Sequence, residues 1–369
     1  DGAEALALAE LVRSEKRKGL DAVYIARDGQ RLQQLQRALA FFAPEVGVLE
    51  FPGWDCLPYD RVSPTPAVVA RRMTTLSELA AHAGDVRPFV LLTTVNALVQ
   101  RVVPPSMVSG QVMTLAPGNM ADMGKLTAWL ENAGFSRSST VRDTGEYAVR
   151  GGILDLYAPG TEAPVRLDFF GDQLESIRTF DPESQRSTGQ LKRLDLVPMS
   201  EVQITPASIK RFRQGYVASF GAATSGDPMY EAVSEGRRYA GIEHWLPLFH
   251  EQLGTLFDYT GDAAVMVDPL VDEAINERLT AVVDHYEARL DTLKTGGSGA
   301  PYKPMPPTTL YLAESELQGL LARRAVARLT PFNRPEQSSV KVVDFGGKTG
   351  RSFAAERAAG DVNIFDELG

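Results

Sequence analysis

The segment GGKTG, from Gly346 to Gly350, contains the residue types of a phosphate-binding loop. Such a loop has the form G-x-x-x-x-G-K-[ST] between a strand and a helix, because its backbone N–H groups must surround the phosphates. Val342 stands where the first glycine of that motif belongs. Proline and polar residues also dominate from Thr330 onward, which is typical of a linker. We therefore expect this segment not to bind ATP.

Other reactive side chains lack a catalytic arrangement. The acidic pairs Asp272-Glu273 and Asp366-Glu367 do not continue into the D-E-x-[DH] motif of nucleotide-driven motors. Cys56 has no evident base beside it, and a free cysteine is commonly a small buried hydrophobe. The histidines show no zinc-binding spacing and are expected to pack or to lie at the surface; they are His82, His244, His250 and His285. The sequence predicts no catalytic residue, cofactor site or metal site.

Aromatic residues and prolines are concentrated in FPGWDCLPYDRVSPTP, which begins at Phe51. Trp54 and Tyr59 are residue types that can stack on the bases of single-stranded nucleic acid. Acidic neighbours and two rigid prolines favour a packed turn instead, so we predict a structural role for both rings. Arg71 and Arg72 follow on a helix and are expected to lie on its solvated face.

Two arginines stand among apolar residues in EYAVRGGILDLYAPGTEAPVRLDFFGD, residues 146–172. The stems of Arg150 and Arg166 can lie on apolar surface while their charged heads reach water, or the heads can be aimed at a partner. Period-two alternation puts Arg166 and Phe170 on one face of a strand and three apolar side chains on the other. An exposed aromatic ring beside a rigid cationic fork is typical of a protein interface.

The composition of the 369 residues is ordinary for a globular protein, with 44% hydrophobic and 23% charged residues. A net charge of −9 disfavours chain-wide binding to nucleic acid. A single cysteine excludes an intrachain disulfide and fits a reducing cytoplasm. There is no run of 18 apolar residues, so no membrane span is expected. Because the chain starts at Asp1 without Met, we expect a fragment of a longer protein.

Helix and strand patterns alternate through the first third of the chain. The predicted strands are 21–27, 46–52 and 88–94, and the predicted helices are 4–19, 28–43 and 66–82. This alternation predicts the fold class α/β, with a parallel sheet that carries helices on both faces.

The pattern then changes to a small α+β unit. It comprises a strand at 110–118, a helix at 120–134 and strand-like runs at 145–158, 164–171 and 173–181. Beyond it the helices are expected at 208–220 and 272–293, the strands at 262–268 and 308–313, and an exposed loop at 294–307. The small unit is expected to be inserted into, or appended to, the α/β domain.

Four segments together resemble the N-terminal region of the bacterial transcription-repair coupling factor family (Mfd). They are FPGWDCLPYDRVSPTPAVVARRMTTLSEL, GEYAVRGGILDLYAPG, VRLDFFGDQLESIRTFDPESQRS and GIEHWLPLF. The resemblance implies a UvrB-like module with a degenerate helicase-like domain 1a at 1–111, an inserted domain 2 at 112–197 and an associated domain 1b at 198–330. Residues 331–369 would be a linker to the next domain.

In that family, domain 2 binds the damage-recognition subunit UvrA. The residues of this sequence that match the family's contact motif are Arg150, Arg166 and Phe170. The resemblance thus favours the interpretation in which the two arginines are aimed at a partner over the one in which their charged heads only reach water. The protein's own C-terminal domain is expected to cover the same face.

The resemblance implies a recruitment module that is not an enzyme and that brings nucleotide excision repair to stalled RNA polymerase. The longer proteins of the family are ATP-dependent DNA translocases. Their ATP and Mg²⁺ sites, and their contacts with RNA polymerase and DNA, would lie outside this chain. The alternative is a fragment of a UvrB-type excinuclease subunit that binds DNA or ATP.

Overall fold

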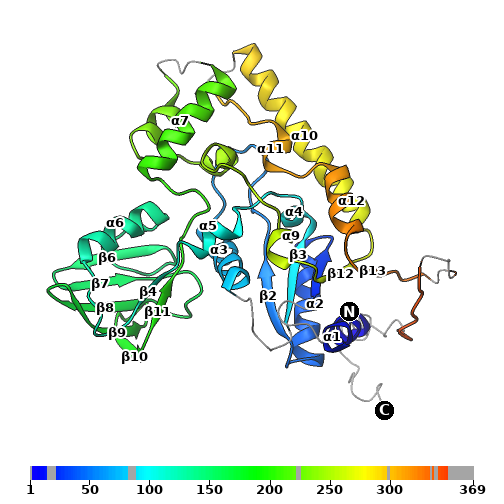
Figure 1. The fold of residues 1–369 in the computed structure, drawn as a ribbon, viewed down its shortest axis with the longest axis horizontal. Helices are drawn as coiled ribbons and strands as arrows, with labels where there is room; N and C mark the ends of the chain where they lie inside the picture. Colours follow the sequence, from blue (N-terminus) through cyan, green and yellow to red (C-terminus); the bar gives the residue numbers. More distant parts are fainter. Residues whose placement is uncertain are drawn as a thin grey trace, which may run out of the picture.

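The computed structural model describes residues 2–14, 22–81, 89–221, 226–296, 300–332, 335 and 340–347. A five-stranded parallel sheet forms one end of the molecule (Figure 1). In spatial order its strands are β13 (Val326–Arg328), β12 (Ala264–Val267), β1 (Ala22–Ala26), β3 (Phe89–Thr94) and β2 (Gly47–Phe51). All four pairings are parallel. Strands from both halves of the chain therefore build one sheet.

Helices cover both faces of this sheet because side chains alternate along each strand. Tyr24 packs in one core with α1 (Gly2–Ser14) and α2 (Gly29–Phe42). Val23 and Ile25 pack in the opposite core, which contains residues of the helices α3 (Pro66–Ala81), α10 (Val271–Thr295) and α12 (Glu314–Ala322). The prediction of an α/β fold with a covered parallel sheet is confirmed.

Further helices connect these layers. They are α4 (Val95–Leu98), α5 (Pro105–Ser109), α7 (Pro206–Phe220), α8 (Pro228–Ser234), η1 (Ile242–Leu248), α9 (Phe257–Thr260) and α11 (Pro307–Leu310). No helix within the described ranges is long and apolar enough to cross a membrane.

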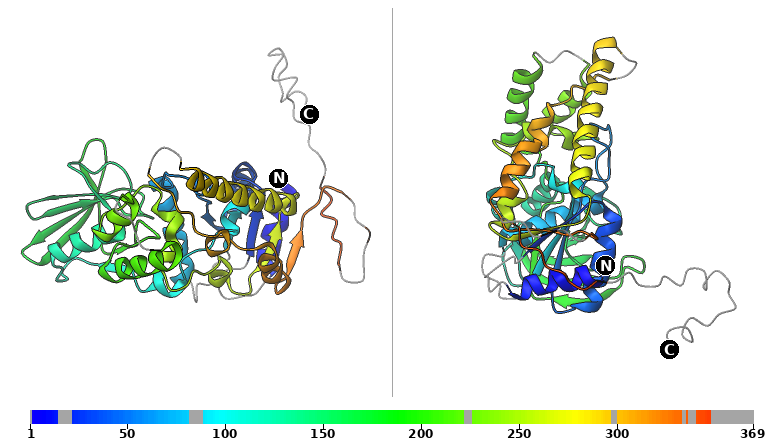
Figure 2. Two further views of the ribbon diagram at one scale, coloured as in Figure 1. Left: turned by 90° about the horizontal axis from the view of Figure 1, so that it is seen from above. Right: turned by 90° about the vertical axis from the view of Figure 1, so that its right-hand side faces the viewer.

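A six-stranded sheet forms the opposite end of the molecule (Figures 1 and 2). Its spatial order is β10 (Ser187–Leu191), β9 (Gln173–Phe180), β8 (Val165–Phe170), β7 (Ile153–Leu156), β6 (Glu146–Arg150) and β5 (Ser136–Arg137). One face packs against α6 (Met123–Ala133) and the two-stranded sheet of β4 (Met113–Leu115) and β11 (Leu194–Leu196). The expected α+β unit is thus observed between β3 and β12.

The run at 145–158 forms two strands instead of one, because the chain turns back at Gly151-Gly152. Gly151 has φ +61°, and a Cβ at Gly152 would lie 2.8 Å from the carbonyl oxygen of Phe169. Glycine meets both conditions without backbone strain or a clash. β5, β11 and β13 were not predicted because each has only two or three residues. β10 was missed because it is almost wholly exposed and has no apolar face.

Two predictions near the end of the chain are wrong. Residues 308–313 do not form a strand. Residues 308–310 belong to the helix α11, whose first residue Pro307 suits a helical first turn, and Tyr311 makes an isolated β-bridge to Gln100. The expected exposed loop at 294–307 buries Tyr302 and Met305. The expected end of the first helix at Gly19 lies outside the described residues.

The predicted domain limits remain predictions, although the parallel sheet takes strands from both 1–111 and 198–330. Within the expected linker the structure describes 331, 332, 335 and 340–347, and the remaining residues lie outside it. Gly346 and Gly347 lie in irregular backbone, and the rest of the GGKTG segment is outside the described part of the chain.

A buried ion pair connects α3 to the end of the antiparallel unit. Arg72 Nη2 lies 2.8 Å from Glu201 Oε1, and both side chains are almost fully buried. Trp54 donates a 3.0 Å hydrogen bond from Nε1 to Glu201 Oε2. The predicted solvated position is correct for Arg71, whose side chain is 58% exposed, and wrong for Arg72. Trp54 and Tyr59 are both buried, as their predicted structural role requires.

Candidate functional site

The six-stranded sheet has one face that is not covered by helices. Arg166 and Phe170 point to this open face, while Val165, Leu167 and Phe169 point into the apolar core, as the alternation predicted. Strand register adds Arg150, because Arg150 pairs with Ile153 and Ile153 pairs with Asp168 of β8. The structure therefore brings the three predicted residues to one face, here called the open face.

Arg166 is held inside this face by an acidic neighbour. Its Nε and Nη2 donate to the two carboxylate oxygens of Asp155 at 2.7 and 2.9 Å. The Arg166 guanidinium also stacks 4.8 Å from the Phe180 ring centre, and the Arg166 side chain is only 16% exposed. The hydrogen bonds to Asp155 raise the pKa of Arg166 above its usual value. Arg166 is thus a positioned, ion-paired group, whereas the sequence suggested an exposed fork.

Asp168 and Arg178 form a second ion pair that the sequence analysis missed. Arg178 donates from Nε and Nη2 to Asp168 at 2.9 and 2.8 Å, and Ser176 also hydrogen-bonds that carboxylate. Burial alone would raise the pKa of Asp168, but these hydrogen bonds lower it below its usual value. Arg178 pairs directly opposite Arg166 across β8 and β9, so a register prediction would have been needed to find it.

Phe170 and Arg150 are the exposed members of the open face. The Phe170 side chain is 76% exposed at the end of β8, next to the turn Gly171-Asp172. Arg150 is exposed at the end of β6 and donates to the carbonyl oxygen of Ser139 at 3.0 Å. The backbone carbonyl of Gln185 accepts a hydrogen bond from Arg166, so a loop covers the end of the face near Arg166. The end near Phe170 is therefore the more open one.

The turn after β1, where a phosphate loop would lie in a parallel sheet, contains acidic groups. Asp28 caps α2 by accepting a 2.8 Å hydrogen bond from the Arg31 backbone N–H. The Arg31 side chain is paired with Asp268 at 2.9 Å and with Glu4 at 2.7 Å. A carboxylate at the helix N-terminus occupies the position that favours a phosphate, and it repels one electrostatically.

The remaining reactive residues are placed for packing. Burial raises the pKa of the Cys56 thiol to about 12, so it is not a thiolate nucleophile. His250 Nε2 hydrogen-bonds the backbone carbonyl of Glu201 at 3.0 Å. Across the ranges that the structure describes, no cluster of three His, Cys, Asp or Glu side chains could hold a metal ion.

His244 is buried between Trp54 and Tyr59, with ring centroids 5.6 and 6.2 Å from its own. Burial lowers its pKa from 6.5 to about 4. As the pH falls, His244 therefore binds a proton in the unfolded chain at a higher pH than in the folded chain. The free energy of unfolding is not reduced by this group above pH 6.5, and it falls as the pH approaches 4. We expect the melting temperature to fall over this window and to fall less for His244→Leu. Melting curves between pH 7 and pH 4 test this; an equally steep fall in the variant would contradict it.

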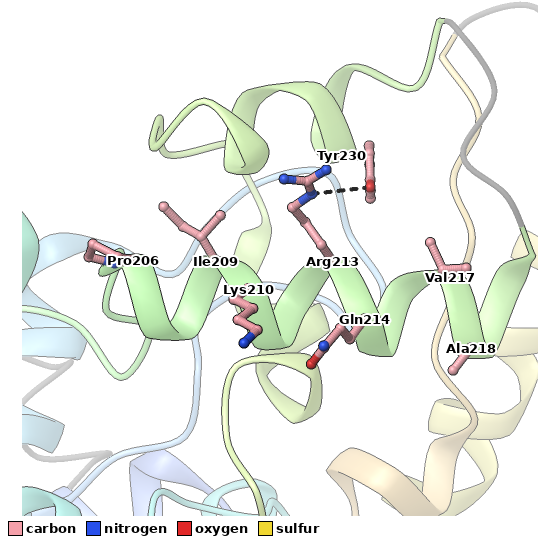
Figure 3. A pocket seen from close by; sticks show the side chains of 8 residues that line it. All are labelled: Pro206, Ile209, Lys210, Arg213, Gln214, Val217, Ala218 and Tyr230. Atoms are coloured by element: carbon pink, nitrogen blue, oxygen red, sulfur yellow. Dashed lines mark hydrogen bonds between the residues drawn. The ribbon is translucent and has the colours of Figure 1, made fainter.

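A groove of about 650 Å³ runs along α7 (Figure 3). Ile209 and Val217 give it an apolar wall, and Arg213 in the same groove hydrogen-bonds Tyr230 at 3.4 Å. Its lining contains no carboxylate, histidine or cysteine, and its polar side chains are Lys210, Arg213, Gln214 and Tyr230.

Comparison with known proteins shows which proteins the chain resembles. Residues 113–202 match the UvrB interaction domain. The chain is 31% identical to the transcription-repair-coupling factor of Rickettsia bellii over 94% of its own length, and 34% identical to that of Escherichia coli over 80%. The chain is a relative of the transcription-repair coupling factors. The resemblance drawn from the four sequence segments is confirmed.

The relatives are much longer than this chain. The match covers 30% of the Rickettsia bellii protein, 25% of the Escherichia coli protein and 24% of the coupling factor of Haemophilus influenzae. The Haemophilus influenzae protein is 34% identical over 75% of this chain. Arg150, Arg166 and Phe170 all lie inside the UvrB interaction domain, residues 113–202.

Proposed function

We propose that this chain is the recruitment part of a transcription-repair coupling factor, and that its UvrB interaction domain binds UvrA through the open face. The observation that carries the proposal is Phe170, a large apolar side chain that is 76% exposed on a sheet whose opposite face packs in an apolar core. Arg150 and Arg166 lie on the same face, and arginine is, with tryptophan and tyrosine, among the residue types enriched at interface hot spots. Binding of purified UvrA to this chain tests the proposal.

The geometry explains how such a face would bind. Phe170 would enter an apolar pocket of UvrA, which removes its exposed ring from water. Arg150 forms no ion pair in the described part of the chain, so its guanidinium can pair with a partner carboxylate. Arg166 is already held by Asp155, so little side-chain entropy would be lost when UvrA covers it.

Replacing Arg166 by alanine should weaken UvrA binding and also destabilise the domain. Asp155 is 1% exposed, and in the described structure its carboxylate hydrogen-bonds only Arg166, so the variant leaves a buried charge without a partner. We expect a loss of about 2 kcal/mol in the free energy of unfolding, measured by urea denaturation.

The matched control is the double variant Asp155→Ala/Arg166→Ala. It removes the unpaired carboxylate, so it should be more stable than Arg166→Ala while binding UvrA equally weakly. If the double variant were the less stable of the two, the ion pair would not be the reason for the destabilisation. If it bound UvrA like the wild type, Arg166 would not contact UvrA.

We further propose that the parallel sheet is a degenerate helicase-like domain that does not bind ATP. Asp28 places a carboxylate at the N-terminus of α2, where a phosphate would lie. We expect no heat of binding when ATP and Mg²⁺ are titrated into the chain, and no change after Lys348→Ala. Saturable binding in the micromolar range would contradict the proposal.

The other partners belong to the longer protein. RNA polymerase, DNA, ATP and Mg²⁺ would be bound by parts outside this chain, and the C-terminal domain would cover the open face until the polymerase is engaged. UvrA should then bind the isolated chain more tightly than the longer protein, and equal affinities would rule this masking out.

A reducing cytoplasm fits the single cysteine.

The alternative of a UvrB-type excinuclease fragment that binds DNA or ATP has less support. Trp54 and Tyr59, the aromatic residues considered for base stacking, are both buried in the core. Their rings have no exposed face to offer to a nucleic acid base.

A further inference from the structure

We infer that the UvrA-docking surface extends beyond the open face of β8 to Met120, across Gln173, and this inference rests on the proposed function. Met120 was not among the predicted site residues. Its side chain is 74% exposed, almost as much as Phe170 at 76%. These are two of the most exposed large apolar side chains in the described part of the UvrB interaction domain.

Backbone pairing places Met120 in the same row as Phe170. Phe170 pairs with Gln173 across β8 and β9, and Gln173 also forms an antiparallel bridge with Met120. Paired residues in a sheet project their side chains to the same face. With strands about 4.8 Å apart, the Cα atoms of Met120 and Phe170 are roughly 10 Å apart.

The segment that carries Met120 is held firmly against β9. Leu174 N donates to the carbonyl of Asn119 at 3.0 Å, and Gly118 N donates to the carbonyl of Leu174 at 2.7 Å. Ala121 N donates to the carbonyl of Asp172 at 2.7 Å. These bonds hold residues 118–121 beside the start of β9 around the single β-bridge of Met120, so Met120 is presented by hydrogen-bonded backbone.

The chemistry of the row defines what UvrA must offer. Phe170 and Met120 flank the polar side chain of Gln173, so the complementary surface needs two apolar depressions with a hydrogen-bonding group between them. A partner that covers Phe170 with an interface of ordinary size, about 800 Å² on each side, also covers a residue roughly 10 Å away. Methionine adapts its shape to such a surface because its side chain is unbranched and flexible.

The test measures UvrA affinity for Met120→Ala, Met120→Asp and Phe170→Ala by calorimetry. We expect Met120→Ala to weaken binding about fivefold and Met120→Asp about thirtyfold or more, since the charge would be buried against apolar surface. The matched control is Phe41→Ala, which removes a side chain that is 79% exposed on α2 in the other part of the molecule and should not change the affinity. Melting temperatures of all variants should stay close to wild type, because the side chains are exposed.

The outcomes separate this inference from the proposed function. If Phe170→Ala weakens binding while Met120→Asp binds like the wild type and melts normally, the extension to Met120 is wrong and the proposed function stands. If the wild-type chain does not bind UvrA, both are wrong. An effect of Phe41→Ala as large as that of Met120→Asp would also overturn the inference, because the loss would not be specific to this row.

Discussion

Replacing Arg72 by alanine is expected to lower the free energy of unfolding by about 3 to 5 kcal/mol. The change removes one partner of a buried ion pair and leaves the Glu201 carboxylate, 1% exposed, without its cation. It also removes packing against the Phe51 ring, whose centroid lies 4.3 Å from the guanidinium carbon, and a hydrogen bond to the carbonyl of Pro52. Urea or thermal denaturation followed by circular dichroism measures the loss.

The preceding residue provides the matched control. Arg71 lies on the same helix and pairs with Glu50 at 3.1 Å, but its side chain is 58% exposed. An exposed pair of this kind contributes about 0 to 1 kcal/mol, so Arg71→Ala should be nearly as stable as the wild type. Equal losses in the free energy of unfolding for the two variants would show that the buried pair of Arg72 with Glu201 does not contribute the expected stability.

Replacing Phe170 by alanine is expected to weaken UvrA binding by about 2 to 4 kcal/mol, roughly thirtyfold to a thousandfold. The change removes the one large apolar side chain that β8 exposes, and the core side of the strand is untouched. The melting temperature should therefore stay within a degree or two of the wild type, on the order of the small effects of surface substitutions. Phe169→Ala, on the buried side of the same strand, should instead lower the melting temperature.

The fold was predictable where a signal is local. The apolar runs at 21–27 and 88–94 predicted strands because a strand covered on both faces needs apolar side chains, and β1 and β3 are buried throughout. The run at 46–52 was also recognised, although β2 is an edge strand in which only Phe51 is fully buried. β13 could not be found in this way, because a three-residue strand with two exposed side chains has no period of its own. Its place in the sheet depends on its pairing with β12, a strand that lies far from β13 in the sequence.

The burial of Arg72 could have been predicted from helical spacing. Arg72 follows Val69 by three positions and precedes Leu76 by four, so it lies on the same apolar stripe of α3. A positive charge in such a stripe requires a buried acidic partner. That partner, Glu201, could not be identified, because the two residues meet only through the tertiary fold.

For the docking residues, too, a local pattern was predictable and the tertiary contacts were not. Alternation along one strand correctly separated Arg166 and Phe170 from the core residues. The ion pair of Arg166 with Asp155 depends on the register between β7 and β8, and the row from Phe170 through Gln173 to Met120 depends on three separate segments. Strand register is a property of the assembled sheet, so these neighbours required the structure.

Titration of purified UvrA against the wild-type chain and Phe170→Ala, with Phe41→Ala as control, tests the central claim most directly. We expect the wild type and Phe41→Ala to bind with the same affinity, and Phe170→Ala to bind at least about thirtyfold more weakly with an unchanged melting temperature. Equal affinities for all three proteins would contradict the claim that the open face of the UvrB interaction domain docks UvrA.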